Sequence, residues 1–535
     1  MPTNHIDSCC VPDEGADHDP DNDENHEDRD GEQTPVEDAD REVVAKRERS
    51  RIDEIQADLP PEERRWKDDI VTWDSKDDPE NPQNWSYSYK VIVTVLFGMI
   101  TMCSTFASSI FSSASNDVSE QYGVSTEVTI LGLSLFVLGY VPGPIFFAPL
   151  SEIYGRRPAV LIPMFVFICF SAATATAKDI QTIFITRFFG GVMASSPVVN
   201  VGGGLADMFN QKERGVAVVW YSLAVIAGPT LGPIIGSAVA EQPKFGWRWT
   251  EYLVVILTST VISFNIMFLP ETFAPALLSA KARRLRLKTG RWELHSRQEM
   301  QDFAIETFVE KNLTRPLRMI VLEPMVGVLT LYNSFAYGIL YLLFGAVPIV
   351  YEEKRGWNPL VGSLPFLAVL VGTLTAAMVN IYYSSHVFAP YLEKHGGRAP
   401  PERRLPPMML GAITFPVGFF LLGWTSDPSI NWFPSVLGLA FIGMSFLLIF
   451  QAGINYLLDA YTKYAASAVA ANTFMRSIFA AALPLVAQPL FHNLGINWAC
   501  TLLGCISVLL AVVPFLFYIY GPKLRAMSKM AADDI

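Results

Sequence analysis

The chain has 535 residues, 51% of them hydrophobic, and a formal net charge of −12. The acid is concentrated at one end: residues 1–89 hold 28 Asp and Glu against 10 Lys and Arg, which leaves +6 for the rest of the chain. This division separates the first 89 residues from the rest of the chain. It predicts an acidic, disordered cytoplasmic tail over residues 1–89, because so few apolar residues cannot offset the entropy of ordering.

Twelve apolar stretches follow the acidic tail. A bilayer core about 30 Å thick is crossed by roughly 20 apolar residues in an α-helix, the form that satisfies every backbone amide in lipid. We place the stretches at about 90–112, 127–148, 158–177, 179–200, 216–239, 250–269, 324–350, 359–382, 406–425, 433–457, 466–490 and 496–520. They predict an all-α integral membrane protein with twelve transmembrane helices.

Lys and Arg are distributed unevenly over the loops between these stretches. With both termini in the cytoplasm, the cytoplasmic loops and C-terminal tail carry 22 Lys and Arg and the external loops carry five. Positive charge in short loops stays on the cytoplasmic side, so this orientation is predicted. The domains expected are an N-terminal six-helix half at 90–270, a cytoplasmic linker at 271–321, a C-terminal six-helix half at 322–521 and a cytoplasmic tail at 522–535. For the basic stretch 281–298 we favour a solvated linker over a helix lying on anionic lipid.

The loop after the second stretch reads APLSEIYGRRPAVL (148–161). Gly155 permits a tight turn, and Arg156 and Arg157 can pair with acids or helix C-terminal carbonyls of the neighbouring half in one conformation only. The loop resembles the signature loop of the major facilitator superfamily, in which the acid stands at Glu152. We therefore expect Glu152, Gly155, Arg156 and Arg157 to form a gating loop.

The fifth stretch contains AGPTLGPIIGS (227–237). Gly228, Gly232 and Gly236 recur every four residues and share one helix face, while Pro233 bends the axis. Helix packing alone explains such a stripe. The segment is also similar to the motif that marks proton-driven antiporters within the same superfamily.

The fourth stretch carries Arg187 well inside the hydrocarbon depth. An arginine there is costly, so it should face a partner or a wet cavity. The surrounding segment, FITRFFGGVMASSPVVN (184–200), is similar to a superfamily pattern whose arginine is associated with proton coupling. Arginine satisfied by carbonyls at the interface of the two halves is the structural alternative.

Six further blocks extend the resemblance over about 78–521. They are DPENPQNWSYSYK (78–90), GWRWTEYL (246–253), LPETFAPALL (269–278), LYNSFAYGILYLLFGAVPIVYEE (331–353), PPERRLPPMMLG (400–411) and NYLLDAYTKYAASAVAANTFMRS (455–477). These blocks resemble fungal twelve-span drug:proton antiporters and polyamine or toxin exporters. The resemblance implies the major facilitator fold, two six-helix pseudo-repeats, and a transporter instead of an enzyme.

Polar residues on the apolar helices define the candidate pathway. Spacings of four residues place some of them on shared faces, although hydrogen bonds between helices explain the amides equally well. The residues expected to line a central cavity for substrate or protons are Arg187, Ser104, Ser108, Asn333, Tyr337, Gln451, Asn455, Asp459 and Arg476.

The charges expected at membrane depth indicate which class of substrate the cavity can bind. Arg187 and Arg476 lie deep, whereas Glu127, Glu251, Glu323 and Asp459 lie near the ends of their stretches, so a neutral or anionic amphipath suits the pocket better than a polyamine. With no GxxxxGK[ST] loop in the sequence, a proton gradient is the expected drive, without a cofactor, and Glu152 and Asp459 are the candidate proton carriers.

The predicted function is secondary active efflux of a drug, fungicide or self-made metabolite. A polyamine exporter and a proton-coupled nutrient importer of the same fold are the alternatives. We expect a monomer in the plasma membrane, or alternatively the vacuolar membrane, with no nucleic-acid partner, catalytic residue or metal.

Overall fold

The structure is a computed structural model. It describes residues 69–242, 244–300, 313–395 and 399–528. Residues 1–68 of the predicted acidic tail and residues 529–535 of the predicted C-terminal tail lie outside these residues, whereas 69–89 are described. The described part is helical and contains no strand; an isolated bridge pairs Ile70 with His295.

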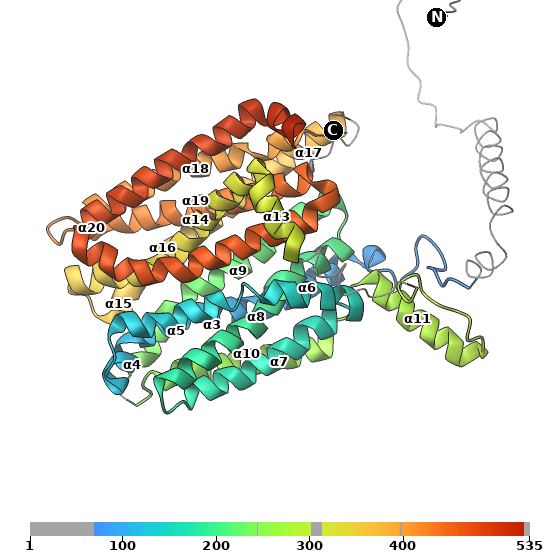
Figure 1. The fold of residues 1–535 in the computed structure, drawn as a ribbon, viewed down its shortest axis with the longest axis horizontal. Coiled ribbons are helices and arrows are strands. Elements are labelled where there is room, and N and C mark those ends of the chain that lie inside the picture. The colour runs from blue at the N-terminus through green and yellow to red at the C-terminus, as the bar shows by residue number, and fades with distance from the viewer. Residues whose placement is uncertain (1–68, 243, 301–312, 396–398, 529–535) are drawn as a thin grey trace, which may run out of the picture. The chain divides into compact units, whose positions relative to one another are not determined.

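The N-terminal half contains six membrane-crossing segments (Figure 1). Their helices are α3 (Tyr87–Ile110), continued by a 3₁₀ turn (Phe111–Ala114) and α4 (Ser115–Tyr122); α5 (Thr126–Leu138) with α6 (Gly143–Tyr154); α7 (Arg156–Ala175); α8 (Ile180–Met208); α9 (Gln211–Ala240); and α10 (Arg248–Phe268). The second segment is interrupted between α5 and α6, where Pro142 and Pro144 remove backbone donors.

The C-terminal half repeats this arrangement. Its helices are α14 (Pro324–Pro348) with a π-helical turn (Ile349–Lys354); α15 (Pro359–Ser363), α16 (Phe366–Tyr383), a second π-helical turn (Ser384–Phe388) and α17 (Ala389–Lys394); α18 (Pro406–Trp424); α19 (Trp432–Ala460); and α20 (Ala465–Met527).

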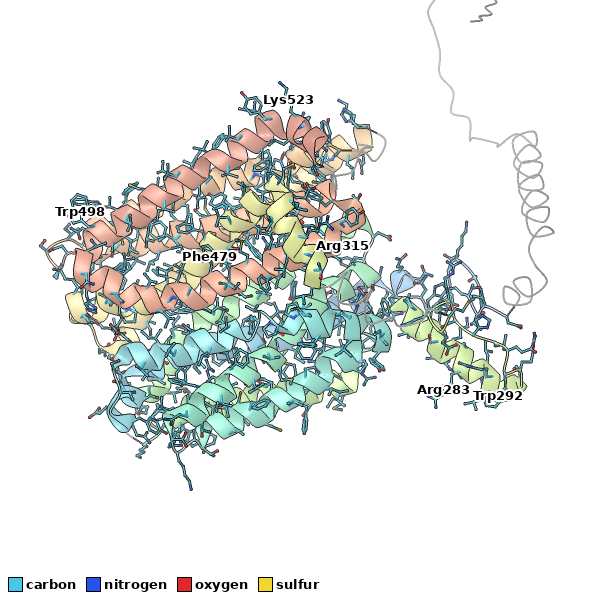
Figure 2. All side chains as sticks on the ribbon, viewed as in Figure 1. Arg283, Trp292, Arg315, Phe479, Trp498 and Lys523 are labelled. Atoms are coloured by element: carbon cyan, nitrogen blue, oxygen red, sulfur yellow. The ribbon has the colours of Figure 1, made fainter. Side chains whose placement is uncertain are left out.

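The last helix, α20, accounts for two spans. Its 63 residues would extend about 95 Å at 1.5 Å per residue, far more than one bilayer. Gly495, with φ 75° and ψ 157°, reverses the chain within it. Figure 2 shows Trp498 and Lys523 at opposite ends of the second arm. The described helices therefore make twelve crossings, which confirms the predicted all-α twelve-helix fold.

The two halves meet along two pairs of helices. α5 packs against α20, and α9 packs against α16. Within the halves, α3 packs on α9 and α14 packs on α20. The same ion pair also occurs in both halves: Arg156 Nε lies 3.1 Å from Asp207 Oδ2, and Arg404 Nε lies 2.8 Å from Asp459 Oδ2. Each pair joins the start of one span to the end of the next, as expected of a structural repeat.

The segment joining the two halves is partly helical. It contains α11 (Ala274–Thr289) and α13 (Arg315–Leu322), and Figure 2 shows Arg283 and Trp292 beyond the ends of the spans. Lys281 Nζ lies 2.9 Å from Asp74 Oδ1 and 3.3 Å from Asp78 Oδ2, so one basic residue of this stretch pairs with the segment preceding α3.

Candidate transport cavity

A cavity of about 770 Å³ lies between the two halves. It begins near the middle of the spans, at Tyr221, Tyr337 and Phe446, and extends to one end of the bundle, at Glu152 and Asp459. We call this end the loop end, because it carries the 148–161 loop, and the opposite end the closed end. A crevice open at one end is the arrangement of a transporter caught in one of its two access states.

The inner wall of the cavity is aromatic with one cation. The guanidinium carbon of Arg476 (α20) lies 5.1 Å from the ring centroids of both Tyr337 (α14) and Phe450 (α19). Arg476 is half-buried and has no ion pair with a described residue. Such a cation, held over rings and facing a cavity, is available to an anionic or aromatic guest.

Five of the predicted pathway residues line this cavity: Tyr337, Gln451, Asn455, Asp459 and Arg476. The amide of Gln451 accepts a hydrogen bond of 3.2 Å from Asn380 Nδ2, which fixes its orientation. Asp459 lies at the loop end and is paired with Arg404. Gln451 and Asp459 thus already have partners in the C-terminal half, and Arg476 is the more available polar group.

Four of the predicted pathway residues do not line the cavity. Asn333 is fully buried in α14 and faces Gly453 of α19, where an added Cβ would lie 2.6 Å from Asn333 Nδ2. Ser104 is also fully buried, 2.9 Å from the Tyr140 hydroxyl, and donates to the Ala194 carbonyl. Asn333 is absent from the lining in this state because a shared face between two residues of a helix does not determine what that face contacts. Its role in the pathway stays a prediction.

Ser108 has a different place in the structure. Its hydroxyl lies 3.0 Å from the hydroxyl of Tyr341, which belongs to the other half. Both side chains are fully buried. This contact between α3 and α14 lies beyond the inner end of the cavity and joins the two halves at the closed end.

The predicted gating loop binds within its own half. Besides Asp207, Arg156 contacts Ser151, and the backbone amides of Arg156 and Arg157 donate to Glu271 at 2.8 and 3.0 Å. Gly155 has φ 97°, a conformation that favours glycine, and so aims both amides at this carboxylate. The described pairs of these arginines all lie in the N-terminal half, as fits a loop end at which the halves stand apart.

The glycine stripe of α9 provides a close helix contact. An added Cβ would lie 2.7 Å from Phe106 N at Gly228, 2.9 Å from Ile110 N at Gly232 and 3.0 Å from Ile110 Cγ1 at Gly236. The stripe therefore lets α9 approach α3 closely, and Pro233 lies within the same helix. The packing role is visible, and a role in antiport stays a prediction.

Arg187 faces neither the cavity nor lipid. It is 2% exposed, and its Nη1 lies 3.1 Å from Oε1 of Glu251, which is fully buried in the first turn of α10. Arg187 also donates to the carbonyls of Ala107 (3.0 Å) and Gly132 (3.2 Å). In this state Arg187 does not line the cavity, because a carboxylate inside the N-terminal half satisfies its charge. Its place in the substrate or proton pathway stays a prediction.

Sequence reasoning missed three acidic partners: Asp207, Glu251 and Glu271. The last two lie in the quoted blocks GWRWTEYL and LPETFAPALL. Their positions at the ends of apolar stretches resemble interfacial residues, so the sequence gives no signal that they turn inward to basic residues of other helices.

Twelve helices in two repeated halves, with a cavity between them open at one end, define a membrane transporter. The comparison with known families agrees: the sequence profile of the Major Facilitator Superfamily matches residues 97–484. The chain belongs to the Major Facilitator Superfamily.

Named relatives cover most of the chain. The "Efflux pump bik6" of Gibberella fujikuroi is 42% identical over 472 residues, which is 88% of this chain and 96% of that protein. The "Major facilitator superfamily multidrug transporter FLU1" of Candida albicans is 40% identical, covering 86% of this chain and 76% of that protein. The "Citrinin biosynthesis cluster MFS transporter mrr1" of Monascus ruber is 41% identical, covering 86% and 92%.

Solved structures confirm the fold. The proton:xylose symporter XylE bound to 6-bromo-6-deoxy-D-glucose aligns with a TM-score of 0.59 at 15% identity, over 81% of this chain and 97% of that one. A POT family transporter in complex with 5-aminolevulinic acid aligns with a TM-score of 0.58 at 14% identity, over 83% and 99%. At such identities the likeness concerns the fold alone.

Proposed function

We propose that this transporter exports small amphipathic molecules by alternating access. The observation that carries the proposal is the cavity between the halves, with an aromatic inner wall and Arg476 at its centre. Apolar rings accept guests of varied shape, and a few polar groups select among them. The relatives named as an efflux pump and a multidrug transporter support the outward direction.

The favoured substrates are anionic or neutral aromatic molecules. Arg156 and Arg404 at the loop end each have a carboxylate partner, whereas Arg476 has an ion pair with no described residue. An anion bound in the inner part of the cavity would therefore meet an unneutralised guanidinium. A drug, a fungicide or a metabolite made by the cell itself fits this description.

A proton gradient is the proposed drive. The sequence has no GxxxxGK[ST] loop, and α9 carries the glycine motif similar to that of proton-driven antiporters. The energy of a gradient is used when binding of the proton and of the cargo favour different access states. With both termini in the cytoplasm, as the loop charges predict, the loop end faces inward. We place the transporter in the plasma membrane, with the vacuolar membrane as the alternative.

Two xanthene dyes of opposite charge test direction and selectivity. The full chain is expressed in yeast cells that lack their own pumps, and the loss of preloaded fluorescein, an anion, and of rhodamine 6G, a cation, is followed by fluorescence. We expect faster loss of fluorescein than in cells without the transporter, and abolition of this difference when the proton gradient is dissipated. Accumulation of fluorescein instead would favour a proton-coupled importer.

One observation favours the alternative of a polyamine exporter: the acidic residues Glu152 and Asp459 lie in the wall of the cavity at the loop end. Competition separates the two substrate classes in the same cells. If spermine slowed dye export more than anionic and neutral aromatic competitors, the polyamine exporter would be the better description.

A further inference from the structure

The buried pair of Arg187 and Glu251 has features that packing alone does not require. Both residues lie inside the N-terminal half near the closed end, and both are almost completely buried. Glu251 Oε2 and Arg187 Nη2 have no hydrogen-bond partner among the described residues. Each ion thus keeps one buried atom unsatisfied, an expensive arrangement for a group with a purely structural role.

The guanidinium of Arg187 is held by more than its ion pair. It lies between the rings of Phe111 and Phe136, at 4.8 and 4.3 Å from the two centroids. The carbonyls of Ala107 and Gly132 accept its hydrogen bonds. Because these neutral partners remain when the carboxylate is neutralised, Glu251 can gain a proton while Arg187 stays charged and solvated by the protein.

Among the described residues, Arg187 is the one charged group that lies against Glu251. The elements packed against α10 carry the following charged or titratable groups: Tyr87, Tyr89, Lys90 and Cys103 (α3), Arg156, Arg157 and Cys169 (α7), residues 212–214, Tyr221 and Glu241 (α9 and its C-terminal end), and Arg248 and Tyr252 on α10 itself. Glu241 is exposed. Lys90, the two arginines of α7 and residues 212–214 belong to the opposite ends of their helices. Arg248 donates to the carbonyls of Ala175 and Ala177. Among the described residues, the charge that faces Glu251 is therefore that of Arg187.

The pair is also connected to the contact between the halves. A single atom, Arg187 Nη1, donates both to Glu251 Oε1 and to the carbonyl of Ala107 in α3. The next residue of α3 is Ser108, whose hydroxyl lies 3.0 Å from Tyr341 of the C-terminal half. A change in the charge of Glu251 therefore alters the hydrogen bond from Arg187 Nη1 to the Ala107 carbonyl. This carbonyl is next in the chain to Ser108, which contacts Tyr341 of the other half.

We infer that Glu251 is the residue that exchanges the transported proton, and that its protonation favours opening of the closed end. The inference rests on the proposed proton antiport. In the state described here the guanidinium of Arg187 lies beside the carboxylate of Glu251 and favours its charged form. Where the halves separate at the closed end and the pair is pulled apart, the carboxylate loses this stabilisation and binds a proton from outside. Oε2 takes that proton, and no other bond changes.

The sign of the pH response follows from linkage. A proton binds better to the state in which the pair is broken, so acidification shifts the population toward that state. When the pair forms again in the inward-facing state, Arg187 favours the carboxylate, and Glu251 gives up its proton. Glu152 and Asp459, the candidate proton carriers predicted from the sequence, lie at the loop end and so differ from Glu251 in position.

Distance measurements on the full chain test this inference without a substrate. Spin labels are attached at Glu120 (α4) and Lys354 (π-helical turn after α14), both exposed and at the closed end of different halves, after the six cysteines are replaced. We expect the fraction with a long distance to rise several-fold from about pH 8 to about pH 5, a range that covers a perturbed carboxyl. Glu251→Gln should show a high fraction that does not change with pH. Glu251→Asp should retain the response, and Glu127→Gln, at an exposed acid in the first turn of α5, should leave it as in the unmodified protein.

An unchanged pH response in Glu251→Gln would overturn the inference, as would the absence of any response in the unmodified chain. If Glu251→Gln does not fold because Arg187 is left without its counter-ion, the double variant Arg187→Gln with Glu251→Gln removes both charges, and it too should be insensitive to pH. Gradient-driven export of fluorescein by the unmodified protein is judged separately. Its absence would refute the proposed antiport and leave the pH response to be decided by these distances.

Discussion

The hydroxyl oxygens of Ser108 and Tyr341 lie 3.0 Å apart, in two different halves of the molecule. Both side chains are fully buried, and the contact lies between the inner end of the cavity and the closed end. A hydrogen bond in this position must break each time the closed end opens. Its free energy therefore contributes directly to the balance between the two access states.

Removing one hydroxyl from this contact should favour the open form of the closed end. A neutral hydrogen bond contributes roughly 0.5–1.5 kcal/mol net, so Tyr341→Phe should raise the ratio of open to closed molecules by about two- to tenfold. The spin-label pair at Glu120 and Lys354 measures this ratio.

Tyr332→Phe is the matched control for that variant. Tyr332 lies on the same helix, is fully buried, and its hydroxyl has no hydrogen-bond partner among the described residues. Its replacement should leave the ratio unchanged. Equal effects of the two variants would mean that loss of a buried hydroxyl, and not loss of the inter-half contact, controls opening.

The glycine stripe of α9 predicts a packing defect. At Gly232 an added Cβ would lie 2.9 Å from Ile110 N, a backbone atom that cannot move aside cheaply. Gly232→Ala should therefore lower the free energy of unfolding by about 1–3 kcal/mol, as overpacking typically does. Thermal unfolding in detergent is the measurement.

Gly202 of α8 offers the comparison, because nothing lies within 4 Å of a Cβ added there. Gly202→Ala should leave the stability unchanged or raise it slightly, since alanine is the better helix former. A midpoint for Gly232→Ala as high as that of Gly202→Ala would show that α3 and α9 are not in tight contact in the membrane protein.

The sequence was sufficient for the fold because the length of an apolar stretch is fixed by the bilayer. All twelve crossings lie where hydropathy predicts them, even where Gly495 is the residue that divides α20. The residues of the substrate pathway are harder to predict from the sequence, because spacing gives the relative direction of two side chains but not what surrounds them. Tyr337 and Asn333 are four residues apart on α14, yet Tyr337 lines the cavity and Asn333 is packed against Gly453.

The partner of Arg187 shows a second limit of the sequence. An acid in the first turn of a span, such as Glu251, has the position of an interfacial residue, and nothing in its neighbours indicates that it turns inward. Only the packing of both α8 and α10 against α3 and α7 brings the two charges to 3.1 Å. Contacts between helices distant in sequence decide such pairs, and hydropathy contains no information on them.

The contact between α11 and the segment before α3 should depend on pH in a defined way. The backbone amides of Glu80 and Asp74 donate to the carboxylate of Asp78, and with Lys281 they hold the pKa of Asp78 below its ordinary 3.8. Burial alone would lower the pKa of Lys281, but its hydrogen bonds and ion pairs with Asp74 and Asp78 outweigh burial and raise it above 10.5.

The direction of the pH dependence follows for Asp78 and for Lys281. The contribution of Asp78 is complete above its unfolded pKa and is lost as the pH falls through the lowered value; that of Lys281 is complete below its unfolded pKa and is lost as the pH rises through the raised value. Hydrogen exchange of the Asp74 and Glu80 amides, corrected for intrinsic rates, should thus be constant near neutrality and accelerate several-fold in strong acid. Lys281→Met should accelerate exchange at neutral pH and the exposed Lys288→Met should not. Equal exchange in both variants would refute the role of Lys281.

The position of Arg476 predicts that the cavity binds anionic substrates better than cationic ones. Its guanidinium lies over the rings of Tyr337 and Phe450 and faces the cavity without an ion pair to a described residue. A charge-assisted hydrogen bond is worth about 1.5–3 kcal/mol, so Arg476→Gln should weaken binding of fluorescein roughly tenfold or more, measured by fluorescence anisotropy on the purified chain. Arg476→Lys keeps the charge but not the planar contact with the rings, so its loss should be intermediate. Binding of rhodamine 6G should not weaken in Arg476→Gln, because removing a cation from the wall reduces repulsion. If both dyes were weakened equally, Arg476 would act on the shape of the cavity, and the preference for anions would have to come from another residue.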